Sequence, residues 1–159
     1  MKAIRLRYPF GLEHFEYTEI ADPGAPGIGE IRVHLQASSI NFHDLAVALG
    51  QMPADDGRIP LSDGAGVVEA VGAGVTEFAI GDHVVSTFFP QWLAGGPVAA
   101  GFAATPGDGI DGYATELAVR PASAFTRAPR GWSHLEAATL TTAGLTAWRA
   151  LTVEGGLKA

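Results

Sequence analysis

The 159-residue chain contains no cysteine. Without a thiol it can form no disulfide, present no thiolate nucleophile and supply no thiolate ligand to a metal ion. Composition alone therefore excludes every zinc site that depends on cysteine. The five histidines show no HxH or HxxxH spacing that would replace it as a metal-binding motif.

Positive charge is also scarce. Ten Lys and Arg residues stand against 17 Asp and Glu residues, which gives a net charge of -7, and the basic residues form no cluster. Nucleic-acid-binding proteins carry a basic patch or stripe that neutralises phosphates. We therefore expect neither nucleic acid nor an anionic membrane surface as a partner.

Long apolar runs are absent. Nowhere do about 18 apolar residues follow one another, as a membrane-spanning helix requires, and the N-terminal residues 1–7 are too charged for a secretory signal. The overall balance, 47% hydrophobic and 17% charged residues, is typical of a folded globular protein. These features predict a cytoplasmic protein of about one domain, by length.

Short stretches of alternating polar and apolar residues predict a protein built mainly of β-strands. In the clearest stretch, 30–37, Ile31, Val33 and Leu35 alternate with polar neighbours, as one buried sheet face requires. Further strands are expected at 2–7, 15–20, 66–71, 83–88, 113–119 and 124–127. The 21 glycines and 10 prolines are spread without a repeat, which favours tight turns between short elements.

Helical patterns are confined to a short segment after Asn41 and to residues 133–151. Ser133 and Glu136 have the spacing of a capping box, which marks the start of the second helix. Residues 89–109 are rich in Gly, Ala and Pro without periodicity. We expect a long loop there, and long ordered loops are often functional.

Four short motifs, at 41–44, 64–68, 81–85 and 142–146, occur in an order that resembles the GroES-like catalytic domain of quinone reductases and alcohol dehydrogenases. Both belong to the medium-chain dehydrogenase/reductase superfamily. The resemblance implies a mainly β fold, a GroES-like partly open β-barrel with short helices, over residues 1–130. It also implies a helical connection, 131–159, toward a Rossmann domain that is absent from this chain, where no strand leads through a glycine-rich turn into a helix.

In the zinc-dependent branch of that superfamily, cysteine and histidine side chains hold the catalytic metal. The corresponding positions here are Asn41, Ser62 and Thr142. Because amide and hydroxyl groups are poor zinc ligands, the resemblance implies no catalytic zinc and no metal-binding residue. The implied cofactor is NADP or NAD, bound mainly through the domain that this chain lacks.

The resemblance implies a zinc-independent, NAD(P)H-dependent oxidoreductase that transfers hydride to or from a small carbonyl, quinone, enone or alcohol. Positioning and hydrogen bonds would then replace the metal. We expect the chain to be inactive without a nucleotide-binding domain. The alternative is a non-catalytic GroES-like module that serves binding or assembly.

By motif matching, the candidate catalytic residues are Asn41, Asp44 and Asp63, and the candidate cofactor-binding residues are Asn41, Thr142 and Thr146. Each has a structural alternative. Asn41 could cap a helix, and Asp44 is better explained as favouring the first helical turn. A solvated turn would account equally well for Asp63.

Aromatic residues offer candidates for a substrate-binding wall, because bulky acceptors need apolar contact area. Phe88, Phe89, Trp92 and Tyr113 are the candidates, with core packing as the alternative. His43 could donate a proton to the reduced product if it faced the cleft. Helix geometry, however, favours an outward orientation at that position.

Family members return a C-terminal segment to complete the catalytic domain. The resemblance therefore implies that this chain leaves apolar surface uncovered. We expect self-association, for example as a homo-oligomer, as one way to cover that surface.

Overall fold

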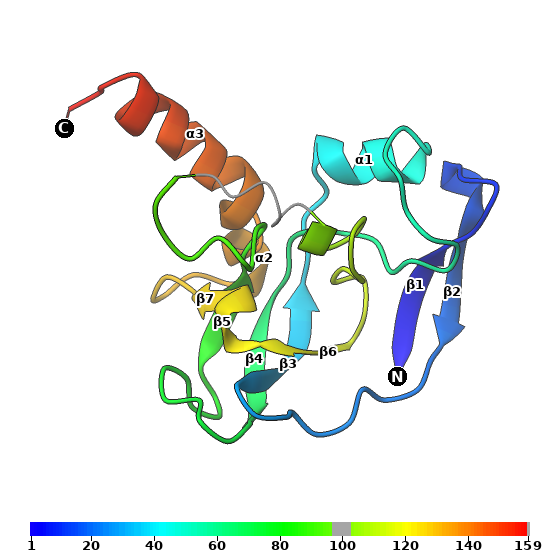
Figure 1. The fold of residues 1–159 in the computed structure, drawn as a ribbon, viewed down its shortest axis with the longest axis horizontal. Helices are drawn as coiled ribbons and strands as arrows, with labels where there is room; N and C mark the ends of the chain where they lie inside the picture. The colour runs from blue at the N-terminus through cyan, green and yellow to red at the C-terminus, as the bar shows by residue number, and fades with distance from the viewer. Residues whose placement is uncertain (97–102, 159) are drawn as a thin grey trace.

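The structure is a computed structural model that describes residues 1–96 and 103–158. It is mainly β, as the sequence predicts, with two antiparallel sheets and short helices (Figure 1). The strands are β1 (Lys2–Leu6), β2 (Phe15–Glu19), β3 (Glu30–Ala37), β4 (Ala65–Val71), β5 (His83–Ser86), β6 (Leu117–Pro121) and β7 (Phe125–Arg127). The α-helices are α1 (Phe42–Ala48), α2 (His134–Ala137) and α3 (Leu145–Arg149).

The strands predicted at 2–7 and 15–20 are present and pair with each other as an antiparallel hairpin. β1 and β2 pair in register from Lys2 opposite Glu19 to Leu6 opposite Phe15. The apolar side chain of Leu6 is fully buried. Backbone hydrogen bonds from Leu6 N to Arg58 O, 2.9 Å, and from Ile4 N to Ala114 O, 2.8 Å, join the hairpin to the rest of the fold.

The larger sheet has the strand order β6-β3-β4-β5-β7, with β3 and β4 near its centre. Along β3, Ile31 and Val33 are fully buried, whereas Arg32 and His34 lie on the opposite face, within ion-pair distance of Glu69 on β4. This alternation confirms the strand predicted at 30–37. β6 and β7 are the edges of the sheet, and the 3-10 turn η3 (Ala122–Ala124) connects them.

The hydrophobic core lies against the inner face of the larger sheet. Its members come from every strand of that sheet and from the segment that precedes β6. They are Ile31, Val33, Leu35, Val68, Val84, Tyr113, Ala118, Ala122, Ala124 and Phe125. Burial of these side chains is the main driving force for the fold, at about 25 cal/mol per Å² of apolar surface.

The strand expected at 113–119 begins later, at Leu117. The backbone N–H groups of Gly112, Tyr113 and Ala114 donate to carbonyls of the 59–61 segment, at 2.7 to 3.0 Å. The predicted strand start was therefore wrong, because these residues pair with a distant loop instead of extending β6. The strand expected at 83–88 likewise ends at Ser86.

The second helical region starts as predicted. The Ser133 N–H donates to Glu136 Oε2 at 2.9 Å, and the Glu136 N–H donates to Ser133 Oγ at 3.3 Å, which confirms the capping box. From α2 the chain continues through the π-helical turn η4 (Leu140–Gly144), α3 and the π-helical turn η5 (Ala150–Glu154). π-helical turns within a helix are frequent at functional sites.

The final helical turns project away from the sheet toward the C-terminus (Figure 1). Their large apolar side chains are each more than half exposed. They are Leu145, Trp148, Leu151 and Val153, and Leu157, beyond the last turn, is also more than half exposed. This is uncovered apolar surface of the kind that the resemblance implies, while self-association remains a prediction.

The loop expected at 89–109 lies partly outside the described residues, which omit 97–102. In residues 89–96 the chain forms turns and bends with no strand or helix. Across the described residues, none of the helices is long and apolar enough to cross a membrane.

Candidate functional site

A fully buried carboxylate, Asp63, is the centre of the candidate site. One of its oxygens accepts hydrogen bonds from Thr141 Oγ1 at 2.9 Å and Thr142 Oγ1 at 2.6 Å. The other oxygen accepts from Ser39 Oγ and Asn41 Nδ2, both at 2.9 Å. Such charge-assisted hydrogen bonds are what allow a carboxylate to be buried. The solvated turn considered for Asp63 is therefore wrong.

Three elements bring this network together. Ser39 and Asn41 lie on the connection from β3 to α1, Asp63 lies just before β4, and Thr141 and Thr142 lie in η4. β3 and β4 are neighbours in the sheet, so the end of one strand and the start of the other meet at the same edge. The helix from Ser133 then carries the two threonines to that edge. We call these five residues the Asp63 network.

Asp44 binds backbone groups and does not join the network. Its carboxylate accepts from the Asn41 N–H at 2.7 Å and from the Ser62 N–H at 2.8 Å. Burial opposes the ionisation of Asp44, but His43 and these two N–H groups outweigh it and hold its pKa below the ordinary value. These contacts show Asp44 fixing the start of α1 and the loop that contains Ser62.

The positions that the resemblance matches to the zinc ligands of the metal-dependent branch lie around Asp63. Asn41 and Thr142 both donate to its carboxylate, and Ser62 precedes it in the chain. Ser62 is fully buried, and its Oγ has no hydrogen-bond partner in the described structure. An amide, two hydroxyls and a carboxylate that already accepts four hydrogen bonds do not fit a zinc ion. In the described ranges no three metal-ligating side chains gather.

A cleft of about 410 Å³ opens beside the Asp63 network. It lies between the segment that follows β5 and the helix that carries Thr141 and Thr142. The lining residues are Thr87, Phe88, Phe89, Trp92, Thr126, Thr141, Thr142, Leu145, Thr146 and Arg149. The cleft therefore combines apolar walls with several hydroxyl groups, a combination typical of small-molecule sites.

One wall of the cleft is a continuous row of aromatic rings, Phe88, Phe89 and Trp92, which we call the aromatic row. The Phe88 and Phe89 rings meet edge to face at 4.7 Å between centroids, and Phe89 lies 6.1 Å from Trp92. These are favourable aromatic separations. Tyr113 does not line this cleft, because it is 2% exposed and its ring packs 5.7 Å from Phe125 in the core.

His43 lies behind the aromatic row and points inward, contrary to the expected outward orientation. Its ring meets Phe88 edge to face at 5.1 Å, and its side chain is 13% exposed. Its Nδ1 lies 3.6 Å from Asp44 Oδ1 and its Nε2 lies 3.3 Å from Asp108 Oδ2. Asp44 first, and then Asp108, outweigh burial and raise the pKa of His43.

The raised pKa of His43 predicts how stability depends on pH. The contribution of the protonated ring is complete below the unfolded value near 6.5 and is lost as the pH rises through the higher folded value. We expect His43→Gln to abolish this decline in the free energy of unfolding, measured by urea denaturation from about pH 5 to 9. The exposed His34→Gln is the control. An imidazole NMR titration that placed the pKa of His43 below 6.5 would contradict the prediction.

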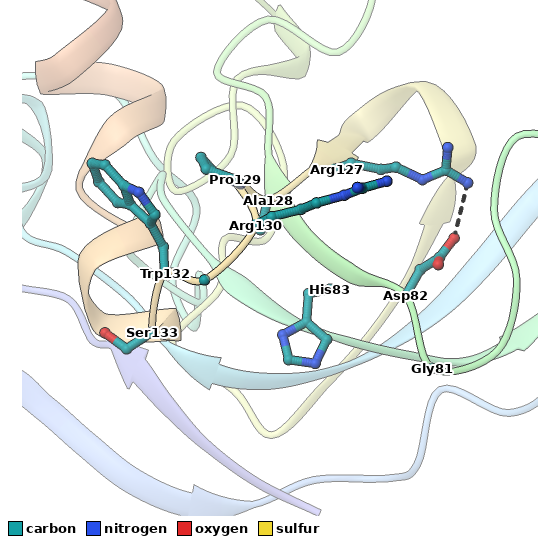
Figure 2. Close-up of a pocket in the computed structure, with 10 residues that line it drawn as sticks. Gly81, Asp82, His83, Arg127, Ala128, Pro129, Arg130, Trp132 and Ser133 are labelled. Atoms are coloured by element: carbon teal, nitrogen blue, oxygen red, sulfur yellow. Dashed lines mark hydrogen bonds and ion pairs between the residues drawn. The ribbon is translucent and has the colours of Figure 1, made fainter.

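A second, larger pocket, about 790 Å³, lies at the other ends of β5 and β7 and contains none of the predicted site residues. Figure 2 shows the His83 ring between two groups of side chains that line this pocket. On one side are Arg127 and Asp82, which form an ion pair at 3.1 Å, and on the other side is Trp132. Sequence reasoning did not identify this pocket, although Gly81, Asp82 and His83 belong to the 81–85 motif. Of the predicted site residues, Thr142 and Thr146 line the cleft, and hydrogen bonds to Asp63 join Asn41 to Thr142, so we take the cleft as the candidate site.

Comparisons with known proteins agree with this fold. The sequence profile of the alcohol dehydrogenase GroES-like domain matches residues 27–130. A zinc-type alcohol dehydrogenase-like protein from Schizosaccharomyces pombe is 38% identical over 143 residues, which are 89% of this chain and 41% of that protein. The chain thus spans less than half of this relative.

Solved structures lead to the same family. An alcohol dehydrogenase from Sinorhizobium meliloti 1021 has a TM-score of 0.85 and 38% identity over 99% of this chain and 48% of its own. A quinone oxidoreductase from Pseudomonas syringae pv. tomato DC3000 has a TM-score of 0.72 and 31% identity over 94% of this chain and 40% of its own. The chain therefore belongs to the alcohol dehydrogenase GroES-like domain family of the medium-chain dehydrogenase/reductase superfamily.

Proposed function

We propose that this chain is the catalytic domain of a zinc-independent oxidoreductase. The reaction is hydride transfer between NADPH or NADH and a small quinone, enone or other carbonyl compound. The observation that carries the proposal is the Asp63 network, in which Asn41 and Thr142, at two of the three matched metal-ligand positions, donate an amide and a hydroxyl to a buried carboxylate. The family relationship supports the reaction class.

Zinc independence follows from the chemistry of these side chains. Zinc in enzymes is bound by thiolates, imidazoles and carboxylates, and Asn41, Ser62 and Thr142 offer none of these. The carboxylate to which Asn41 and Thr142 donate is Asp63, and protein donors engage both its oxygens. The relative from S. pombe is named zinc-type, but the described residues of this chain gather no three His, Cys, Asp or Glu side chains that could hold such an ion.

The hydrogen-bond directions define what the cleft offers to a ligand. Each threonine hydroxyl has one proton and two lone pairs. Thr141 and Thr142 donate their protons to Asp63, so they present only acceptors to the cleft. Such acceptors suit the N–H groups of a carboxamide, like that of nicotinamide, or the hydroxyl of an alcohol.

Thr146 has the complementary role. Its hydroxyl lines the cleft, has no hydrogen-bond partner in the described structure and is free to donate. A donor of this kind stabilises a carbonyl oxygen that gains negative charge during hydride transfer. When bound, the nicotinamide supplies the hydride. Because one hydroxyl activates a carbonyl less than a metal ion does, we expect quinones and conjugated enones to react better than simple ketones.

A chimera tests the proposal directly. Residues 1–158 are joined to the remaining half of the S. meliloti alcohol dehydrogenase, which supplies the part of the relative that this chain does not span. We expect oxidation of NADPH or NADH by 1,4-benzoquinone, unchanged by a chelator, and no turnover by the chain alone. Thr142→Val should lower kcat/KM at least about tenfold, a loss of ~1.4 kcal/mol of transition-state binding, while Thr152→Val, which lies outside the cleft, should not.

Two results would count against the proposal. Stoichiometric zinc together with loss of activity on chelation would indicate a metal-dependent enzyme. A folded chimera that binds cofactor but transfers no hydride to any acceptor would favour the non-catalytic binding module.

A further inference from the structure

Among the described residues that line the cleft, Arg149 is the only one with a charge. It ends α3, and its guanidinium carbon lies 5.9 Å from the centroid of the Trp92 ring. This cation–π contact holds the guanidinium at one end of the aromatic row. The apolar wall of the cleft therefore ends in a positive charge.

The ion pair of Arg149 leaves it available to a ligand. Its Nη2 lies 3.2 Å from Glu154 Oε1, and the two side chains are 52% and 66% exposed. Exposed ion pairs of this kind contribute little to stability and exchange readily with other anions. A guanidinium carries five N–H donors in a planar fork, and Glu154 occupies only one side of it. The remaining donors match a carboxylate or a phosphate.

The rest of the cleft defines the other half of the ligand. The aromatic row favours a planar, unsaturated body, and the hydroxyls of Thr142 and Thr146 lie on the helix that faces it. The volume of about 410 Å³ lies within the range of small-molecule pockets. A ligand that fills this space extends from the threonines toward Arg149.

We propose that Arg149 is the anion-recognition residue of this cleft, so that its ligand is an unsaturated or aromatic carbonyl compound that also bears a carboxylate or phosphate. The inference rests on the proposed function, because it assigns a ligand class to the same cleft. The anion has two sources: an acidic group on the substrate, or the phosphate next to the nicotinamide of the cofactor. Both pair with the guanidinium by the same chemistry.

Binding to the chain itself tests this, with no need for turnover. Isothermal titration compares cinnamate with cinnamamide, and nicotinamide mononucleotide with nicotinamide riboside, so that each pair differs in one anionic group. We expect at least one anion to bind about tenfold more tightly than its neutral partner at low salt, with the preference shrinking as ionic strength rises. Preference in the first pair identifies a substrate acid, and preference in the second identifies the cofactor phosphate.

Three variants test whether Arg149 causes the preference for the anionic compound. Arg149→Met should remove the preference for the anion and leave the affinity for the neutral partner unchanged. Glu154→Gln should strengthen anion binding about twofold to fivefold, because a competing carboxylate is lost. Arg130→Met, which removes an exposed arginine in the other pocket, should change neither. The exposed position of Arg149 lets these variants fold, which nuclear magnetic resonance spectra of each would verify.

The outcomes separate this inference from the proposed function. Equal binding within both pairs, unaffected by Arg149→Met, would overturn the role of Arg149 and leave the cleft as a site for neutral carbonyl compounds. Binding of none of the four compounds would overturn the role of Arg149 and remove support from the cleft as a whole.

Discussion

Replacing Asp63 with asparagine is expected to lower the free energy of unfolding by about 3 kcal/mol, because two partly buried donors would lose their buried acceptor and each such loss costs ~1–3 kcal/mol. Thr141 and Thr142 donate to one carboxylate oxygen, and Ser39 and Asn41 donate to the other. An asparagine side chain presents an NH₂ group to one of these pairs. Donors would then face a donor in a fully buried position.

Equilibrium unfolding in urea, followed by circular dichroism, measures this loss. The matched control is Asp55→Asn, which removes a carboxylate that is 87% exposed and paired with Arg58, and which should cost less than about 1 kcal/mol. A loss at Asp63 no larger than at Asp55 would mean that the network is dispensable for folding. The hydrogen bond to Asp63 would then not be what holds Thr142 at the cleft.

The second large effect is expected at Gly66, in the Gly64-Ala65-Gly66 motif. A Cβ atom there would lie 2.1 Å from the carbonyl oxygen of His34 and 2.9 Å from the Cα of Leu35. Both atoms belong to the backbone of β3, which pairs with β4 at this point and cannot move aside as a flexible side chain can. Gly66→Ala should therefore cost at least about 2 kcal/mol by forcing the two central strands apart.

Thermal and urea unfolding of Gly66→Ala would show this cost, with Gly96→Ala as the control. A Cβ at Gly96 meets no atom within 4 Å, and its φ angle is not positive, so its replacement should be neutral. Unchanged stability of Gly66→Ala would show that β3 and β4 can separate without loss. In that case the motif would reflect something other than the close approach of these strands.

The fold could be predicted wherever one local pattern determined the structure. The strand at 30–37 was predicted with its observed bounds, because Ile31 and Val33 alternate with polar residues over eight positions. The start of β6 could not be predicted in this way. Tyr113 and Ala114 satisfy their backbone N–H groups on residues 59–61, a pairing between distant segments that local periodicity does not report.

At the candidate site, too, the sequence could predict which residues matter but not which distant residues they contact. Motif matching selected Asn41, Asp63 and Thr142, and the structure brings all three into one network. Motif matching could not show that Asn41 and Thr142 both donate to Asp63, nor that Ser39 also does. Neither the order nor the spacing of motifs reports hydrogen-bond partners.

His43 shows most clearly what the sequence pattern could not predict. Its inward orientation places it between Asp44 on its own helix and Asp108 in a segment without periodicity. Only the folded structure brings that second carboxylate close. Arg149 was missed for a similar reason, since its significance depends on Trp92, a loop residue far away in the sequence.

The Asp63 network also constrains the order in which the molecule can be completed. Its two threonine donors come 78 and 79 residues after Asp63 in the chain. A polypeptide is made from its N-terminus, at about 5–20 residues per second, so both sheet strands that flank Asp63 exist for several seconds before their last partners do. During that interval the carboxylate must stay hydrated, which keeps this edge of the sheet open to water. Docking of the helix that carries the threonines expels that water, so the Asp63 network is complete only after this helix has been synthesised.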